Sequence, residues 1–453
     1  MIAARASHPV TPASPQDVGG RAEAVARTSY GRLVAILAAP DGDLEAAEDC
    51  LADAFAHALA TWPRTGVPSN PEAWLVTVAR HRRHDLRRSA AHRLTDPIDV
   101  ASGGAHGGAH GGALACLQEV DPDAVPDRRL ALLFVCAHPA IDPAVRTPLM
   151  LQTVLGFGAD QVARAFAIPT ATMAQRLVRA KRRIRDARVP FAVPDRGRMP
   201  ARLPPVLEAI YGAYAIEFPL VAGPATRDLL LTEAHVLATA LAEALPEAPE
   251  ALGLAALLSL SLARRPAQRA HDGGADDAFV PLEAQDPARW DAGLIALGER
   301  YLERARGLGR IGRFQVEAAI QSVHCARARS GVTDWRALRL LYAALLLVAP
   351  TLGARVAHAA AVGRVEGPAA GLAALDAIPG AAAQRFQPAW AARAHLLAAA
   401  GRADEAGHAY ARAIALTTDA AARRYLEERR THVSGPWDTR AAGAAALPIE
   451  ALG

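Results

Sequence analysis

Lysine is almost absent from this sequence. Lys181 is the only lysine among 50 lysine and arginine residues, so nearly every positive charge is an arginine. A GC-rich genome favours arginine and alanine codons together, and arginine abundance alone therefore says little about phosphate binding. Only the placement of the arginines along the chain can indicate a partner.

Aromatic residues are also scarce, at 5% of the chain, whereas alanine and leucine are abundant. Aromatic and β-branched side chains fill sheets, while Ala, Leu, Arg and Glu lose little conformational freedom in a helix. With 453 residues, 51% of them apolar, the chain can bury a sizeable core and has room for roughly three domains. We therefore predict an all-α fold.

Cysteine is limited to four residues, Cys50, Cys116, Cys136 and Cys325, which lie far apart and form no CxxC pair. This spacing excludes a disulfide framework or a cysteine zinc site and is typical of reduced thiols. The N-terminus lacks a basic-then-apolar signal pattern, and no apolar run reaches about 18 residues. We expect a soluble, cytoplasmic protein with no membrane partner.

The motifs of common enzymes are missing as well. The sequence has no glycine-rich phosphate loop, no HExxH, no GxSxG and no carboxylate pair with a plausible pocket. His106 and His110 lie four residues apart in the repeat GGAHGGAHGGA, but no carboxylate or thiol flanks them closely. We therefore predict a protein that is not an enzyme, with no catalytic residues, no metal site and no cofactor.

What the sequence does have is positive charge in two places. Residues 1–200 hold 24 basic against 20 acidic residues, and residues 201–453 hold 26 of each. The excess lies mostly in Arg80–Arg93, with six arginines and one acid, and in Arg164–Arg188, with eight basic residues and one acid. Local clusters of this kind favour a polyanionic partner.

Proline-rich and glycine-rich stretches separate the helical patterns. The glycine–histidine repeat is typical of a flexible linker. Near the end of the chain, Trp390–Leu416 predicts a helix hairpin with small residues on its second helix, which fits one unit of a TPR-like array. The segments we predict are a disordered tail (1–24), a helical domain (25–94), a Gly/His-rich linker (95–126), a second helical domain (127–195), a TPR-like helical extension (201–432) and a tail (433–453).

The second basic stretch has the layout of a helix-turn-helix. A first helix spans Ala159–Phe166, a turn with Pro169 follows, and Thr170 is a plausible N-cap for the second helix. At 100° per residue, one compact apolar stripe forms from Met173, Leu177, Ala180 and Ile184.

The opposite face of this second helix offers bidentate donors that suit guanine and phosphate. Lys181 and Arg185 fall off that face, so we exclude them from base reading. The alternative is that this helix has no DNA-binding role and is an ordinary amphipathic helix with a solvated arginine face. The predicted DNA-binding residues are Thr172, Gln175, Arg176, Arg179, Arg182 and Arg183.

The first half of the chain predicts a different surface. Glu45–Trp62 is an amphipathic helix with acidic residues near one edge, and the loop Arg64–Asn70 leads to a helix that begins at Pro71. A basic helix beside a polar loop suits single-stranded DNA, because arginines follow the phosphates while the loop receives an unstacked base. The residues on its outer face are Thr77, Arg80, Arg83, His84 and Arg87, and the acidic residues of the preceding helix are Glu45, Glu48, Asp49 and Asp53.

One detail of this basic helix, the role of Trp74, remains open at the sequence level. Trp74 could stack on a base, but a position in the helix core is favoured. Leu75, Val78 and Leu86 are expected to face inward with it.

Together these blocks resemble the sigma-2 and sigma-4 domains of extracytoplasmic-function (ECF) sigma factors. The similar residues are AEDCLADAFAHALATWP, NPEAWLVTVARHRRHDLRR and ADQVARAFAIPTATMAQRLVRAKRRIRD. The extension resembles a subgroup with a fused C-terminal TPR-like domain, through phrases such as GRADEAGHAYARAIAL.

The resemblance implies partners and roles. The acidic helix would bind the β′ clamp of core RNA polymerase, with the β flap as a further contact. The loop with Asn70 and the basic helix would recognise and melt the −10 element, and the face Thr172–Arg183 would read the −35 element. The extension would modulate activity and bind a protein or a small ligand. Two alternatives stay open. One is a stand-alone helix-turn-helix regulator with a helical sensor domain, and the other is a helical-repeat scaffold or an all-α enzyme whose basic helices are solvated faces.

Overall fold

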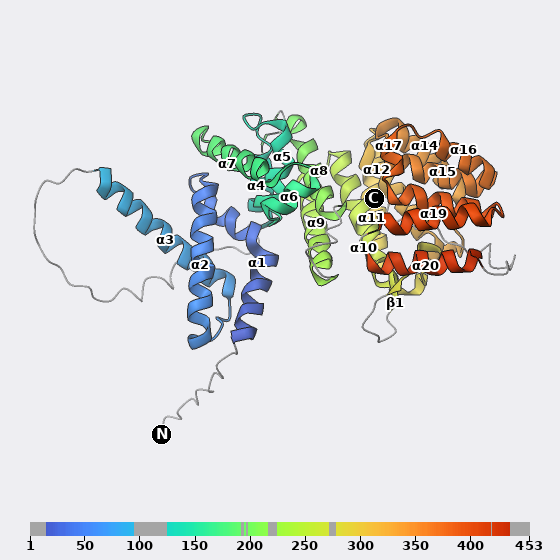
Figure 1. Cartoon of the computed structure of the whole chain (residues 1–453). Coiled ribbons are helices and arrows are strands. Elements are labelled where there is room, and N and C mark those ends of the chain that lie inside the picture. The colour runs from blue at the N-terminus through green and yellow to red at the C-terminus, as the bar shows by residue number, and fades with distance from the viewer. Residues whose placement is uncertain are drawn as a thin grey trace, which may run out of the picture. The chain divides into compact units, whose positions relative to one another are not determined.

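The computed structural model describes residues 15–94, 125–191, 194–195, 198–215, 224–270, 278–417 and 419–434. The chain divides into two compact units, one made of Met1–Ile216 with Pro224–Glu233 and the other of Glu217–Gly223 with Ala234–Gly453. Helices form nearly all of the regular structure in both (Figure 1), which confirms the all-α prediction.

Among the described residues of the first unit, the regular secondary structure is helical. The bounds of the helices are α1 Pro15–Ala38, α2 Leu44–Thr65, α3 Pro71–Leu94, α4 Val125–Cys136, α5 Pro143–Thr153, α6 Ala159–Ala165, α7 Thr170–Asp186, α8 Met199–Ala215 and the start of α9 Pro224–Ala244.

The first three helices pack against one another around fully buried side chains that include Leu33, Leu51 and Trp62. Helix α1 begins at Pro15, inside the segment predicted as a tail. Proline suits the first turn of a helix, and Ala22 is already buried, so this early part has a packing surface.

Helices α4, α5, α7 and α8 pack around a second part of this core, which includes Phe134 and Leu149, and α6 packs on α5 and α7. Helix α8 packs on α4 and α5 and buries Val206 and Ile210. The helix that the sequence assigned to the extension therefore belongs to the first unit, because its apolar face is covered there.

The second unit holds the remaining helices and one small ladder. The longer helices are α10 Pro249–Ala263, α11 Ala292–Gly307, α12 Arg313–Cys325, α14 Trp335–Val348, α15 Leu352–Glu366, α16 Pro368–Asp376, α18 Gln387–Ala399, α19 Ala403–Leu416 and α20 Ala420–Ser434. The shorter ones are α13 Arg327–Ser330, α17 Ala381–Gln384 and 3₁₀ turns at Arg265–Ala267, Leu282–Ala284 and Pro287–Arg289. Strands β1 Arg269–Ala270 and β2 Ala278–Phe279 pair antiparallel, with Arg269 opposite Phe279.

Consecutive helices of this unit pack as neighbours, α14 with α15, α15 with α16, α18 with α19 and α19 with α20. The hairpin predicted over Trp390–Leu416 is present as α18 and α19. Its second helix buries the small residues Ala406, Ala409 and Ala413, which let the two helices approach closely.

Candidate nucleic-acid interface

Helix α2 carries the four predicted acidic residues. Its N-cap is Asp43, whose side chain accepts a hydrogen bond from the Ala46 N–H at 3.0 Å. Asp49 and Asp53 are exposed, whereas Glu45 and Glu48 are partly covered. Asp53 forms an ion pair with Arg82 of α3 at 3.0 Å, which joins the acidic helix to the basic one.

The loop before α3 positions Asn70 as a helix cap. The Asn70 Oδ1 accepts a hydrogen bond from the Ala73 N–H at 3.0 Å, while the rest of the side chain is exposed. On the first turns of α3, the Thr77 hydroxyl donates to the Ala73 carbonyl at 2.8 Å. Both residues therefore have a local structural role beside the one predicted for them.

The outer face of α3 differs from the prediction at Arg83. Arg80 and His84 are exposed as expected, and the side chain of Arg87 lies outside the described residues. Arg83 is buried, with 8% exposed, and donates to the Leu37 carbonyl in the last turn of α1 and to Asp41 in the turn that follows. The prediction that Arg83 shares the outer face is therefore wrong, because the end of α1 covers this position and the turn after it supplies an acidic partner.

The inner face of α3 mostly agrees with the sequence. Leu75 is buried, and Trp74 packs edge-on against Trp62 of α2 with 5.4 Å between ring centroids. Leu86, expected to face inward, is 50% exposed. Leu86 lies beyond the turns of α3 that pack on α1 and α2. The apolar periodicity of the sequence therefore continues past the part of the helix that has a packing partner.

Helices α6 and α7 form a short helix, a turn and a longer helix. The turn holds Ala167 in the left-handed region with φ of 52°, and the N-cap of α7 is Pro169 instead of the predicted Thr170. Proline has no N–H to satisfy, which suits this position, and Thr170 becomes the first helical residue. The predicted apolar stripe is confirmed, since Met173, Leu177, Ala180 and Ile184 are all buried.

The face of α7 opposite the stripe is polar and accessible. Thr172 and Arg176 are half-buried. The Arg179 Nε donates to the Gln175 carbonyl at 3.3 Å, so its guanidinium lies along the helix. The exposed members of the predicted set are Gln175, Arg179, Arg182 and Arg183.

Sequence reasoning missed a contact between α7 and α2. Lys181 is buried beside the apolar stripe and forms an ion pair with Glu48. Burial raises the pKa of Glu48 above its usual value, and the positive charge of Lys181 opposes this rise. The two residues are 133 positions apart. The one sequence signal for this site is that Lys181 is the single lysine of the chain.

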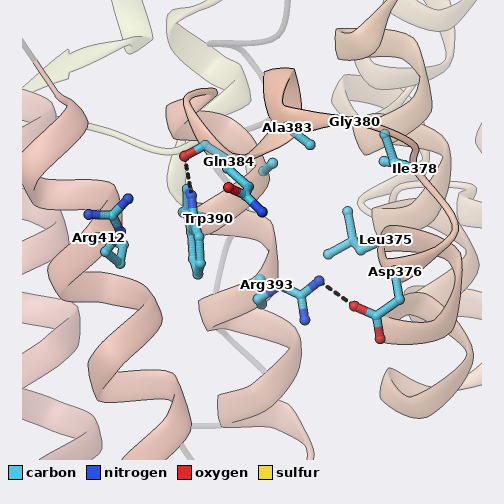
Figure 2. Close-up of a pocket in the computed structure, with 10 residues that line it drawn as sticks. Leu375, Asp376, Ile378, Gly380, Ala383, Gln384, Trp390, Arg393 and Arg412 are labelled. Atoms are coloured by element: carbon cyan, nitrogen blue, oxygen red, sulfur yellow. Dashed lines mark hydrogen bonds and ion pairs between the residues drawn. The ribbon is translucent and has the colours of Figure 1, made fainter.

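The second unit has a half-open pocket of about 760 Å³ between α16, α17, α18 and α19 (Figure 2). Leu375 and Ile378 form an apolar wall, and the Trp390 Nε1–H donates to the Gln384 carbonyl at 2.9 Å. Arg393 pairs with Asp376, and the Arg412 guanidinium lies 5.5 Å from the centre of the Trp390 ring. Two arginines and one acid give this lining a net positive charge.

Neither a metal site nor a membrane span is found in the described part of the chain. No group of three or more His, Cys, Asp or Glu side chains there is arranged to hold a metal ion. None of the helices in it is both long and apolar enough to cross a membrane.

Comparison with known protein families finds a match for the first helices of the chain. The family model for sigma-70 region 2 matches residues 26–93, which contain α2 and all but the last residue of α3, with their acidic and basic faces. This part of the chain is similar to sigma-70 region 2. A second family model, for a family of unknown function (DUF6596), matches residues 202–306. This second match gives the extension no function and does not test the TPR-like prediction.

Two curated proteins are similar to larger parts of the chain. "Uncharacterized protein R00370" from Rhizobium meliloti is 34% identical over 395 residues, which cover 86% of this chain and 91% of the relative. "Probable ECF RNA polymerase sigma factor SigI" from Mycobacterium tuberculosis is 30% identical over 156 residues, covering 34% of this chain and 50% of SigI. No solved structure matches the chain.

Proposed function

We propose that this protein is an ECF-type sigma factor of the sigma-70 family, which binds core RNA polymerase and directs it to −35 and −10 promoter elements. The observation that carries the proposal is the combination of the region 2 match over residues 26–93 with a second block, α6–α7, whose exposed face is rich in arginine. Two separate DNA-facing helices suit a protein that contacts two separate promoter elements.

The −10 contact is assigned to α3 and the loop before it. Arg80 and His84 are exposed on one side of α3, where they are free to follow a phosphate backbone. Asn70 lies exposed at the start of the helix, although its Oδ1 caps α3. Arg83 is left out of this surface, because it is buried against α1.

The −35 contact is assigned to the exposed face of α7, as the second helix of a helix-turn-helix. Arginine donates two parallel hydrogen bonds to guanine or to phosphate, which suits the major groove. The burial of the opposite stripe fixes the orientation of this face relative to the helices that support it. Polymerase binding is assigned to the acidic side of α2, chiefly to the exposed Asp49 and Asp53. No catalytic step is proposed for this chain.

The test is transcription with purified full-length protein, core RNA polymerase and a library of promoter fragments. Specific transcripts that require the protein are the expected result. Binding to duplex DNA without any transcript would favour the stand-alone regulator. If the protein gives no specific transcript and shows no salt-sensitive binding to duplex DNA, the helical scaffold is the remaining interpretation.

We further propose that the second unit modulates this activity by binding an organic anion in the pocket beside Trp390. An apolar wall and a fixed indole ring suit an apolar body, while Arg412 supplies a charge for a carboxylate at the rim. Octanoate, compared with octylammonium of the same length, is the probe for this site.

Binding is measured by isothermal titration calorimetry on the full chain. Octanoate should bind more tightly than octylammonium, and Arg412→Gln should remove this preference. The matched control is Arg336→Gln, which changes an exposed arginine on α14, outside the pocket. Equal binding of both probes would refute the anion site, and an effect of octanoate on transcript yield would link the site to regulation.

A further inference from the structure

The first unit buries an arginine, Arg202, for which its described part supplies no acceptor. The residue lies in the first turn of α8 and is only 5% exposed. Its Nε is fully covered and has no hydrogen-bond partner among the described residues. A buried cation is costly unless an acceptor or an anion compensates it, so the surroundings of Arg202 are expected to receive one from outside the chain.

The comparison with the other buried cations makes Arg202 distinctive. In the described part of the first unit these are Arg83, Arg129 and Lys181, and each of them is paired with a carboxylate. The partners are Asp41, Glu233 and Glu48, respectively. The chain therefore compensates its buried positive charges elsewhere in this unit, and the position of Arg202 departs from that pattern.

The charges around Arg202 are mostly positive as well. Burial lowers the pKa of Arg202, the positive charge of Arg198 lowers it further, and that of Arg146 acts in the same direction. Asp195 is the acid that opposes them, and its carboxylate already lies 3.6 Å from the Arg198 Nε. Three arginines against one carboxylate leave an excess of two positive charges at this place.

The turn before α5 holds two further groups of this cluster in place, and α5 packs on α8. The Arg146 Nε donates to the Ile141 carbonyl at 3.0 Å, which fixes the direction of its guanidinium. The His138 Nδ1 accepts a hydrogen bond from the Ala140 N–H at 3.1 Å. Burial lowers the pKa of His138, as do the charges of Arg202 and its neighbours, so the ring is neutral at pH 7 and carries its proton on Nε2.

We propose that Arg202, Arg198 and Arg146 form a binding site for a small oxyanion, a phosphate group above all, at the start of α8. The inference does not depend on the promoter-reading function. A phosphate dianion carries about two negative charges at neutral pH, which matches the excess of positive charge, and its oxygens accept hydrogen bonds from several guanidinium groups at once. A small ion suits the burial of Arg202 better than a DNA backbone does, because a duplex contacts side chains that project from the surface.

The first test is isothermal titration calorimetry with inorganic phosphate on the full-length protein, at an ionic strength held constant with sodium chloride. The parent for this experiment carries Arg412→Gln, so that the pocket beside Trp390 does not contribute. One phosphate per chain is expected, and Arg202→Met should raise the Kd by about tenfold or more. The matched control is Arg164→Gln, because that arginine pairs within its own helix α6. Absence of phosphate binding in the parent, or equal binding by Arg202→Met, overturns the proposal.

Thermal unfolding separates a ligand-binding role of Arg202 from a structural one. Phosphate should raise the Tm of the parent and leave that of Arg202→Met unchanged, because only the parent binds the ion. In phosphate-free buffer Arg202→Met should be at least as stable as the parent, since it lacks the uncompensated charge. If Arg202→Met is instead less stable there and gains as much from phosphate as the parent does, Arg202 is structural and the proposal is overturned.

A second variant tests the site without disturbing the packing of α8. Arg198 is exposed, so Arg198→Gln should fold as the parent does and should weaken phosphate binding by about threefold. An unchanged Kd in this variant would remove Arg198 from the site and overturn the proposed set of residues. Repeating the titration with saturating random-sequence duplex DNA distinguishes the source of the phosphate group. Inorganic phosphate should still bind, and loss of its binding in the presence of DNA would overturn the small-ion proposal, because the site would then hold a phosphate of the nucleic acid.

Discussion

Trp74 of α3 stacks on His57 of α2, with ring centroids 5.7 Å apart and ring planes within 5° of parallel. Its indole also meets Trp62 edge-on, so Trp74 fills the contact between the acidic and the basic helix. The sequence left this residue open between base stacking and core packing. The structure places it in the packing between α2 and α3, and its loss should therefore affect folding before it affects DNA binding.

Trp74→Ala should destabilise the first unit by about 2 kcal/mol, somewhat less than for a fully buried tryptophan, because the ring is half-buried. Urea unfolding followed by circular dichroism measures the change. Leu59→Ala is the control, since Leu59 on α2 is 50% exposed, and it should change stability by less than about 0.5 kcal/mol. Equal stability of Trp74→Ala and wild type would contradict the packing role.

Arg176→Ala tests the promoter face of α7. Loss of a bidentate base contact should weaken binding to a selected promoter duplex by about 1–3 kcal/mol and relax the sequence preference at one position. Anisotropy titrations against the selected and a shuffled duplex measure both effects. Arg164→Ala on α6 is the control, because that arginine pairs with Asp160 within its own helix. An unchanged promoter profile for Arg176→Ala would remove this residue from the face.

Local periodicity explains why some of this site could be predicted from the sequence. The stripe Met173–Ile184 repeats at helical spacing, and its burial depends only on which face of α7 packs. The same periodicity placed Arg83 on the outer face, which is wrong, because the Leu37 carbonyl and Asp41 approach it from the end of another helix and the turn after that helix. Periodicity describes one helix at a time and carries no information on what a neighbouring helix presents.

The same limit applies to the contact between α2 and α7. The angular analysis left Lys181 and Arg185 off the proposed promoter face, but it could not identify their acidic partners, which lie more than a hundred residues earlier. The predicted domain boundary has the same limit, because a local sequence pattern does not show which helices pack together. A proline-rich stretch suggested a boundary near residue 200, whereas the apolar face of α8 is buried within the first unit.

Gly371→Ala should destabilise the second unit by about 1–3 kcal/mol. A methyl group at Gly371 on α16 would lie 2.8 Å from the Cα of Gly363 on α15, and the backbone of a neighbouring helix cannot yield as a flexible side chain can. Gly407→Ala is the matched control, since nothing lies within 4 Å of that position on α19. It should stabilise the protein by about 0.5–1 kcal/mol, because alanine favours the helix. Thermal unfolding measures both, and a loss of stability in Gly407→Ala equal to that in Gly371→Ala would contradict the contact.

Two buried histidines predict acid sensitivity of the second unit. Burial, with Arg264 and Arg327 nearby, lowers the pKa of His324 to about 3, and burial with Arg364 and Arg429 lowers that of His395 to about 3. Because each folded-state pKa lies below the unfolded value of about 6.5, the unfolded chain binds more protons between these limits. Stability from the neutral rings is therefore fully present above pH 6.5 and falls as the pH drops towards 3, by about 1.4 kcal/mol per pH unit for each histidine.

Hydrogen exchange of α12 and α18 amides at pH 7 and pH 5.5 measures this loss. In the double variant His324→Gln, His395→Gln, the free energy of unfolding should change less between pH 7 and pH 5.5, whatever its absolute value. If the change in that variant equals the change in the wild type, other groups cause the acid sensitivity.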